Sequence, residues 1–421
     1  MRLPYVDEGR ERAAPRVAGV GSSVAGTPGV LDVRRSAWAT RLVFAANGGL
    51  FATWASRLPA VRDDLGADER GLGFALLFIA VGSLLAMPFS GRLVSAVGAR
   101  AVLVVCIVVC CLAYPTLALA PNLVVLSAVL FVIGAGTGVW DVAMNVSGHV
   151  VEREAGRDLM PGFHAAWSIG TVVGAGLGAL AAKAGLDPAI HFTVVSAVTA
   201  VFALLSVRVM PEGTEEPDPG DFAEGEHHVP GPTGPLILDP RLLGLGVMTF
   251  CAAWAEGSAN DWLALMMSDD RGASGALAAV GFATFATAMT VGRLVGTAVV
   301  TRLGRVRTLR VGAVVAAAGM ALLLGVPVLG VGYLGALLWG LGISVAFPLA
   351  MTAAGETPGR GPSAIATVAT IAYAGFLVGP PLIGSLAHSV GLDHALWVVV
   401  LLGAGMFALA GTARDPRGVR G

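Results

Sequence analysis

Apolar runs of membrane-spanning length follow one another along almost the whole chain after residue 37. A helix needs about 20 mainly apolar residues to cross the hydrocarbon layer of a bilayer. Inside lipid the backbone finds no water to bond with, and a helix satisfies its own N–H and C=O groups, so the runs predict helices. We place twelve spans at residues 40–58, 71–90, 101–119, 123–147, 161–183, 189–209, 242–266, 275–299, 308–328, 331–354, 363–387 and 393–412.

Polar stretches divide these spans into two groups of six. Residues 211–240 are rich in acidic residues, Pro and Gly and cannot build a core, so we predict a cytoplasmic linker there. Residues 1–37 carry several arginines but no compact apolar stretch, which favours a disordered cytoplasmic tail over a secretory signal. A second cytoplasmic tail is expected at 413–421, which leaves six-helix bundles at 38–210 and 241–412.

Composition and charge exclude several classes of protein. Hydrophobic residues make up 55% of the chain and charged residues 13%, against about 25% charged residues in soluble proteins. We therefore predict an all-α membrane protein surrounded by a lipid bilayer, and the net charge of −1 gives no bulk attraction to nucleic acid. Cys106, Cys110, Cys111 and Cys251 lie in apolar runs, so we expect packing thiols, with no metal and no cofactor.

The placement of arginine predicts the orientation in the membrane. With the N-terminus inside, most arginines fall on the cytoplasmic side, as the positive-inside rule requires. The outer side then holds only Arg57, Arg62, Arg70, Lys183 and Arg271. We therefore expect a multi-pass protein of the cytoplasmic (inner) membrane with both termini in the cytoplasm.

The two halves of the chain resemble each other at an offset of about 206 residues. Three sets of glycines match in order, each at a corresponding place in its half: Gly134 and Gly136 with Gly340 and Gly342, Gly170 and Gly174 with Gly375 and Gly379, and Gly98 with Gly304. A parallel repeat of two six-span halves is typical of secondary transporters.

Two segments carry a resemblance to a known family. Residues 91–100, Gly-Arg-Leu-Val-Ser-Ala-Val-Gly-Ala-Arg, resemble the G-x-L-x-D-R-x-G-R-R/K loop of the major facilitator superfamily, and residues 302–305 form a degenerate second copy. Residues 138–145, followed by Glu152, His164 and Trp167, are similar to the bacterial branch near fucose:proton symporters. The resemblance covers roughly residues 38 to 412. It implies twelve helices in two bundles that rock around a central cavity, giving alternating access.

The chain departs from that pattern at two places. The loop aspartate of the family is Ser95 here, and the arginine after it is Ala96, which puts the charge relay of this loop in doubt. In the fucose branch spans 1 and 4 each carry an acid, whereas here span 1 offers only Asn47 and span 4 keeps Asp141.

Few ionisable residues lie inside the spans: Asp141, His164, Glu256, Asp261 and Arg293. Each costs about 2.5–3.5 kcal/mol on insertion scales, so such residues usually mark a pathway or site. Asp141 shares a small, polar helix face with Gly134, Gly138 and Asn145, which suits a cavity or a close helix crossing. It is either a proton carrier or half of a static ion pair. His164 opens span 5 and either relays protons or is an ordinary interfacial residue.

Span 7 combines aromatic rings, acids and an amide between residues 254 and 262. Trp254, Glu256, Asn260 and Asp261 would suit a polar solute, because rings stack on its apolar faces and acids accept its hydroxyls or cations. The glycine and serine at 257 and 258 permit local unwinding. Alternatively, Asp261 and its neighbour Trp form the outer membrane interface.

Arg293 lies in the cytoplasmic half of span 8, at a depth similar to that of Asp141, and needs a carboxylate partner in lipid. If the resemblance holds, an Asp141–Arg293 pair, with or without His164, would close an inner gate. Asn47 and Trp54 in span 1 and Tyr373 in span 11 either line the cavity or pack between helices. The Gly170, Gly174 and Gly178 ladder predicts close helix packing.

These patterns favour a secondary active transporter that works as a monomer and takes up a polar solute, such as a sugar, together with protons. Proton-driven efflux is the alternative. The Gly-Pro motif that efflux antiporters of the superfamily typically carry is missing from span 5. A non-transporting membrane sensor or scaffold is a third possibility. The sequence shows neither an ATP-binding loop nor a nucleophile–base pair, so we expect no enzyme.

Overall fold

The computed structural model describes residues 30–156, 159–211, 236–358 and 360–414, and the regular elements of this part of the chain are all helices joined by short turns. The helices are α1 (Val30–Leu65), α2 (Glu69–Val97), α3 (Ala99–Leu117), α4 (Leu123–Ala155), α5 (Met160–Lys183), α6 (Pro188–Val207), η1 (Leu236–Leu238), α7 (Pro240–Asp269), α8 (Gly275–Leu303), α9 (Arg305–Gly325), α10 (Leu329–Ile343), α11 (Ala346–Gly355), α12 (Gly361–Val390), α13 (Leu392–Ala395), α14 (Trp397–Leu409) and η2 (Ala410–Ala413).

The first helix begins earlier than the sequence indicated. The tail predicted at 1–37 is wrong for its last residues, because α1 already starts at Val30. The hydroxyl of Ser36 donates to the carbonyl of Val209, two residues after the end of α6 and 2.9 Å away, which ties the start of α1 to the bundle. The rest of that tail, most of the linker at 211–240 and most of the tail at 413–421 lie outside the described residues.

Within the described residues, eleven helical segments are long and apolar enough to cross a membrane. They correspond to the second through twelfth predicted spans, with α10 and α11 together making one of them and α13 to η2 another. The remaining helix, α1, is 36 residues long but carries more polar residues. The prediction of an all-helical membrane fold is therefore confirmed.

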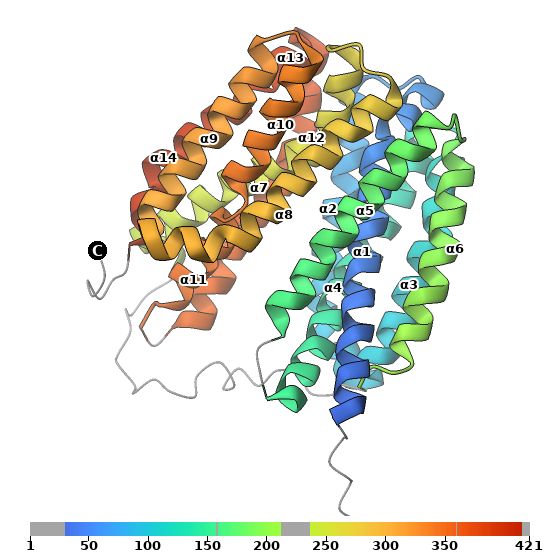
Figure 1. Cartoon of the computed structure of the whole chain (residues 1–421), viewed down its shortest axis with the longest axis vertical. Coiled ribbons are helices and arrows are strands. Elements are labelled where there is room, and N and C mark those ends of the chain that lie inside the picture. Colours follow the sequence, from blue (N-terminus) through green and yellow to red (C-terminus); the bar gives the residue numbers. More distant parts are fainter. Residues whose placement is uncertain (1–29, 157–158, 212–235, 359, 415–421) are drawn as a thin grey trace, which may run out of the picture.

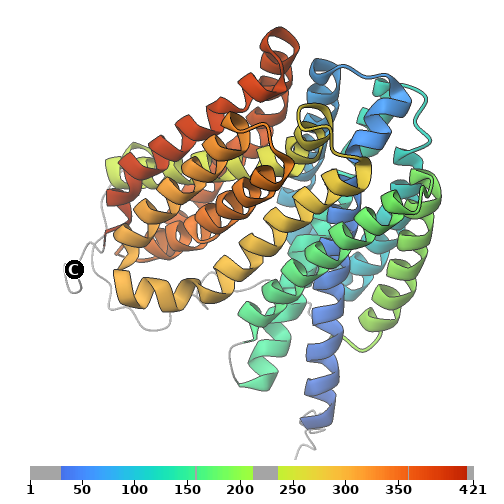
Figure 2. The ribbon, with the colours of Figure 1, turned by 45° about the horizontal axis from the view of Figure 1, so that its top comes forward.

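The helices form two bundles, α1 to α6 and α7 to α14 (Figure 1). In the first, α1 packs on α5 and α2 on α4, and in the second, α7 packs on α12 and α9 on α10. The bundles meet where α5 lies along α8 and where α2 lies along α12, and the turned view shows α8 running beside α5 (Figure 2). A route between the bundles is therefore walled by these helices.

The internal repeat is visible in the turns. Gly98 and Gly304 end α2 and α8 with φ of 84° and 76°, a left-handed region that suits glycine. Each N–H donates at 2.8 Å to a carbonyl four residues earlier, that of Val94 or Val300. Two more left-handed pairs keep the same spacing of 206 residues: Gly66 with Gly272, and Gly185 with Gly391. The structure thus confirms the match of Gly98 with Gly304 and shows two pairs that the sequence reasoning missed.

The matched glycines inside the spans sit at equivalent helix crossings. A β-carbon added to Gly134 would lie 2.0 Å from the carbonyl oxygen of Ile79, and one added to Gly340 would lie 2.4 Å from that of Phe285. The backbones touch because no side chain intervenes, as is common between membrane helices. The predicted packing role of the Gly ladder is also confirmed, since Gly170, Gly174 and Gly178 abut Ala45, Gly49 and Ser56.

The molecule has two distinct ends. At the linker end α1 begins and α6 and α14 finish (Figure 1). At the opposite end, called here the closed end, polar side chains join the bundles: Arg62 of α1 bonds Asp269 of α7, and His388 of α12 lies 3.2 Å from Asp68 beside α2. The two helices α2 and α12 also meet there through glycines, since a β-carbon on Gly384 would be 2.4 Å from the carbonyl oxygen of Glu69.

Candidate functional site

A charge pair lies in the second bundle. Glu256 on α7 and Arg293 on α8 approach to 3.4 Å between Oε1 and Nη2. The expected Asp141–Arg293 pair is not formed in this structure, because Arg293 finds its carboxylate within its own bundle. Helix α8 packs on α7 and α10, which brings Arg293 to Glu256 rather than to Asp141 of α4.

Arg293 also reaches a break in the tenth span. The helix stops at Ile343 and restarts at Ala346. Pro348 has no N–H, so the carbonyl of Ser344, four residues earlier, loses its helical partner. The Nε of Arg293 donates to that carbonyl at 3.4 Å. The guanidinium thus serves a buried carbonyl as well as a carboxylate, and Pro348 was the sequence signal for a break that the predicted span at 331–354 missed.

The seventh span, by contrast, is continuous. The local unwinding predicted around Gly257 and Ser258 is wrong, since α7 runs unbroken from Pro240 to Asp269. The hydroxyl of Ser258 donates to the carbonyl of Trp254 at 2.8 Å, an ordinary bond back along the helix. Gly257 instead makes room for the ring of Phe376 on α12.

The polar face of α4 is divided between two roles. Its glycine part forms the close crossing, because a β-carbon on Gly138 would lie 2.5 Å from the hydroxyl of Ser83 on α2. Beyond it, the Nδ2 of Asn145 donates to the backbone carbonyl of Asp141 at 2.8 Å and lies 3.4 Å from its carboxylate. Among the described residues Asp141 makes no ion pair, so the static ion pair finds no support there and the proton carrier stays a prediction.

Asn47, Phe51 and Trp54 of the first span have different surroundings. Asn47 accepts a hydrogen bond from the indole of Trp167 at 2.9 Å, and Phe51 stacks on the same indole with centroids 6.3 Å apart. Trp54 is only 4% exposed and packs on Phe192 of α6, inside the first bundle. The structure therefore brings Phe51 to the space between the bundles, uses Asn47 to hold Trp167, and keeps Trp54 away from it.

The tryptophan next to Asp261 in the seventh span is buried. Trp262 is 0% exposed, so the interpretation of Asp261 and Trp262 as a membrane-interface pair is wrong for the indole. Trp254 faces α12, where its ring would meet a β-carbon on Gly379 at 2.8 Å. For Asp261 the described part of the chain records no hydrogen bond or ion pair.

A narrow cavity lies between the bundles, walled by α1, α5, α7 and α8. Its volume of about 20 Å³ leaves room for roughly one water molecule. It brings together three predicted residues, Glu256, Asn260 and Arg293. The other lining residues are Phe51, Trp167, Ser168, Thr171, Phe282, Phe285, Ala286, Met289 and Thr290. Of these, Ser168 and Thr171 share a helix face with His164, which was the signal that could have placed them.

Ionisable groups outside the lining interact electrostatically with charged residues of the cavity. His164 of α5 lies within electrostatic range of Arg293, and Tyr373 of α12 lies within range of both Asp141 and Glu256. The ring of His164 also stands edge-on to Phe44, with centroids 5.4 Å apart. A proton or charge that changes on one of these groups is therefore felt across the bundle boundary.

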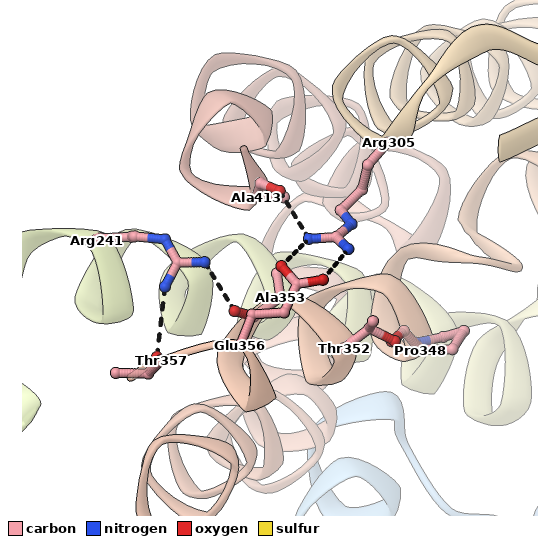
Figure 3. A network of polar contacts seen from close by, with 8 residues as sticks. All are labelled: Arg241, Arg305, Pro348, Thr352, Ala353, Glu356, Thr357 and Ala413. Carbon is pink, nitrogen blue, oxygen red and sulfur yellow. Dashed lines mark hydrogen bonds and ion pairs between the residues drawn. The ribbon is translucent and has the colours of Figure 1, made fainter. Parts of the chain in front are cut away.

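A separate polar network holds the linker end of the second bundle (Figure 3). Arg305 donates to both carboxylate oxygens of Glu356, at 2.7 and 2.5 Å, and to the carbonyl of Ala413 at 3.2 Å. Arg241 donates to the carbonyl of Ala353 at 2.7 Å. These bonds join the starts of α7 and α9 to the ends of α11 and η2. Glu356 was not singled out from the sequence.

The equivalent loop of the first bundle uses different contacts. Ser95, which stands where the resembled family has aspartate, donates to the carbonyl of Gly91 in its own helix at 3.0 Å. Glu152 at the end of α4 accepts from the backbone N–H groups of Leu159 and Met160, at 2.5 and 2.7 Å. An acid thus caps the start of α5, where unpaired N–H groups favour negative charge.

Comparison with known proteins decides the family. The family model of the Major Facilitator Superfamily matches residues 40–363 and 245–420. This chain belongs to the Major Facilitator Superfamily. Its members are transporters and not enzymes, and the prediction of a non-enzymatic transporter is confirmed.

The superfamily member has relatives over nearly its full length. It is 36% identical over 380 residues to an uncharacterised MFS-type transporter of Yersinia pestis, covering 89% of this chain and 94% of that one. It is 32% identical over 368 residues to an uncharacterised transporter of Sinorhizobium fredii, covering 87% and 95%. The fold is similar to the crystal structure of the nucleoside transporter NupG, with a TM-score of 0.72, 13% identity and coverage of 89% and 98%.

Proposed function

We propose that this transporter carries a small polar solute, such as a sugar, by alternating access, coupled to protons and in the direction of uptake. The observation that carries the proposal is the cavity between the bundles, where Glu256 and Arg293 face aromatic residues of the first bundle. Ionisable groups at such depth are costly unless they serve a route. The resemblance to fucose:proton symporters supports the same direction of transport, and we propose that the chain acts as a monomer.

We further propose that α1 is a twelfth span. At 36 residues it is long enough to cross a bilayer, and it packs along α5. Its polar groups face the bundle: Asn47 is 8% exposed, and Arg57 is 5% exposed and donates to the carbonyl of Leu186 at 2.6 Å. An even number of spans supports placing both termini on one side, the cytoplasmic side of an inner membrane.

In that orientation the closed end faces outward. The pairs Arg62–Asp269 and Asp68–His388 join the two bundles there. Opening the protein to outside solute requires these pairs to separate, while the linker end closes. These contacts at the outer end support an inward-facing state of the transport cycle.

We assign proton coupling or gating to Asp141, His164, Glu256 and Arg293, and a place on the solute route to Asp261. Proteoliposomes that enclose a pH-sensitive dye test this assignment. We expect at least one solute from a panel of hexoses, nucleosides and organic acids to drive proton entry in the wild type, with a large loss in Asp141→Asn. If no solute moves protons or accumulates, the sensor or scaffold interpretation holds instead.

A further inference from the structure

Arg293 is held more loosely than Arg305, another paired arginine of the second bundle. Its two recorded contacts, to Glu256 and to the carbonyl of Ser344, are both 3.4 Å long. Charge-assisted N–H···O bonds are usually about 2.7–2.9 Å long. The pair of Arg305 with Glu356, at 2.5 and 2.7 Å, shows a tight fork in the same bundle. A guanidinium has five N–H donors, so Arg293 keeps capacity for another acceptor.

That capacity is directed at the cavity. The side chain of Arg293 is 31% exposed and that of Glu256 is 18% exposed, and both line the cavity wall. They are the charged members of the lining, because Asp141 and Asp261 are not part of it. A planar guanidinium binds a carboxylate with two parallel hydrogen bonds, which fixes both its position and its orientation.

The cavity as it stands holds about one water molecule, so the proposal requires the bundles to part when the solute enters. The rest of the lining would then suit the body of a small organic acid. Phe51 and Trp167 present stacked rings from the first bundle, which favour a flat or apolar face. Asn260 and Thr290 add polar groups from α7 and α8 beside Arg293. A neutral polyol would leave the Glu256–Arg293 pair intact, and an amine would meet the guanidinium head-on.

We propose that the transported solute is a small carboxylic acid whose carboxylate replaces Glu256 on Arg293. This proposal rests on the transport function above and narrows its substrate to organic anions. When the solute carboxylate binds, Glu256 loses its cation and takes up a proton from the water on the open side. One proton then accompanies each monoanion, and the net charge of the cavity stays constant.

Other ionisable groups lie outside the cavity lining and form the electrostatic background of this exchange. They are His164 from α5, Tyr373 from α12, Asp141 from α4 and, on the same helix as Glu256, Asp261. None of them contacts Arg293 through a recorded hydrogen bond, so each tunes the exchange without replacing it.

Thermal stability of the purified full-length protein tests the substrate class. Two matched sets serve as probes: benzoate, benzyl alcohol and benzylamine, and glucuronate, glucose and glucosamine. We expect at least one acid to raise the unfolding midpoint by about 1–3 °C at saturation, with no comparable shift from its neutral or amine counterpart. The proposal is overturned if neither acid stabilises the protein, or if a neutral or amine member does so equally.

Variants locate the effect. Arg293→Gln should abolish the acid-induced shift of the unfolding midpoint. Arg293→Lys keeps the charge but loses the two parallel N–H donors, so it should need at least tenfold more acid for the same shift. Arg302→Gln, an exposed position on the same helix, is the matched control and should respond like the wild type. An unchanged response of Arg293→Lys would contradict the proposal even if Arg293→Gln failed to fold.

Proton uptake separates the exchange from simple anion binding. In weakly buffered solution the wild type should take up about one proton per bound acid, whereas Glu256→Gln should bind the acid and take up none. Acid binding with equal proton uptake in Glu256→Gln would refute the exchange. Acid binding without any flux in proteoliposomes would refute transport but leave the acid site in place. Flux of neutral solutes alone would support transport and refute the acid site.

Discussion

The tenth span and its counterpart in the first half solve the same packing problem differently. Gly134 of α4 and Gly340 of α10 occupy equivalent crossings, yet α4 is continuous over 33 residues while α10 stops at Ile343. Four residues after Gly134, Gly138 packs against Ser83 and Met87 of α2. At the position of Met87 in the repeat the second half has Arg293, which bonds the carbonyl of Ser344, the counterpart of Gly138.

The difference teaches that the repeat fixes the helix crossings but not the charges. Val142 in α4 corresponds to Pro348 in α11 at the spacing of 206 residues seen in the turns. The proline leaves a carbonyl without its donor at membrane depth, where an unpaired group costs several kcal/mol. Arg293 offsets that cost, and Glu256 in turn balances its charge. The first half needs no such cation and carries Asp141 instead.

The largest expected effect on stability comes from moving the proline that breaks the tenth span into the matching position of the first half. Val142→Pro should destabilise the protein by about 3 kcal/mol or more, because α4 offers the carbonyl of Gly138 no replacement donor. Pro348→Val, the mirror change, should stay within about 1 kcal/mol of the wild type, since Arg293 already tolerates the broken form. The four buried free cysteines allow thermal unfolding to be followed with a thiol-reactive dye. Equal losses in the two variants would remove the contrast between the halves.

Loss of the Arg293 guanidinium should have the second-largest effect on stability. Arg293→Leu strands a partly buried carboxylate and the carbonyl of Ser344, with an expected cost of about 2–4 kcal/mol. Adding Glu256→Leu should restore part of the stability, because the isolated charge is removed as well. Arg302→Leu on the same helix is the control. Unfolding midpoints of the four proteins measure the effect, and a double variant no more stable than Arg293→Leu would argue against the pair.

Both halves should respond alike at their shared crossings. Gly134→Ala and Gly340→Ala should each cost about 1–3 kcal/mol, because the added methyl group meets backbone and forces the helices apart. Gly176→Ala is the control, since no atom lies within 4 Å of its added β-carbon. Thermal unfolding again provides the measurement. If one substitution destabilised the protein and the other stabilised it, the repeat would not extend to the helix contacts.

The smallest effect tests the repeat at the closed end. Burial and the neighbouring Asp393 and Asp269 carboxylates raise the pKa of Asp270, whose counterpart Asp64 is exposed. Because the folded protein holds this proton more tightly than the unfolded one, stability falls as the pH rises above the ordinary aspartate value of 3.8. Asp270→Asn should therefore gain about 0.5 kcal/mol at pH 7, and little below pH 4. Asp64→Asn, at the exposed counterpart, is the control variant in the same pH series.

Sequence patterns predicted the parts of this protein that depend on local chemistry. Apolar length gave the spans, and Gly98 and Gly304 revealed the repeat, since a left-handed turn or a backbone contact demands glycine wherever it occurs. The partner of Arg293 could not be predicted in this way, because it depends on which helix of which bundle faces α8. The burial of Trp54 against α6 depends on the same three-dimensional arrangement.

Two errors had a readable cause. Gly257 and Ser258 suggested unwinding, but small residues also serve to admit a neighbouring ring, and Phe376 fills that space. Pro348 lay inside a predicted span and was passed over, although a missing N–H is a stronger sign of a break than a glycine or serine. The identity of Ser95 was correctly noted, and its hydroxyl bonds only to its own helix turn among the described residues.

The glycine crossing between α2 and α12 has a mechanical consequence. A β-carbon on Gly73 would lie 2.5 Å from the carbonyl oxygen of Pro380, so the two backbones touch without interlocking side chains. A contact of this kind can pivot without any rotamer having to change. The water-exposed Asp68–His388 pair beside it is of the kind worth only about 0–1 kcal/mol. The crossing therefore suits a pivot about which one half tilts against the other. Few contacts have to break at the pivot itself when the halves tilt.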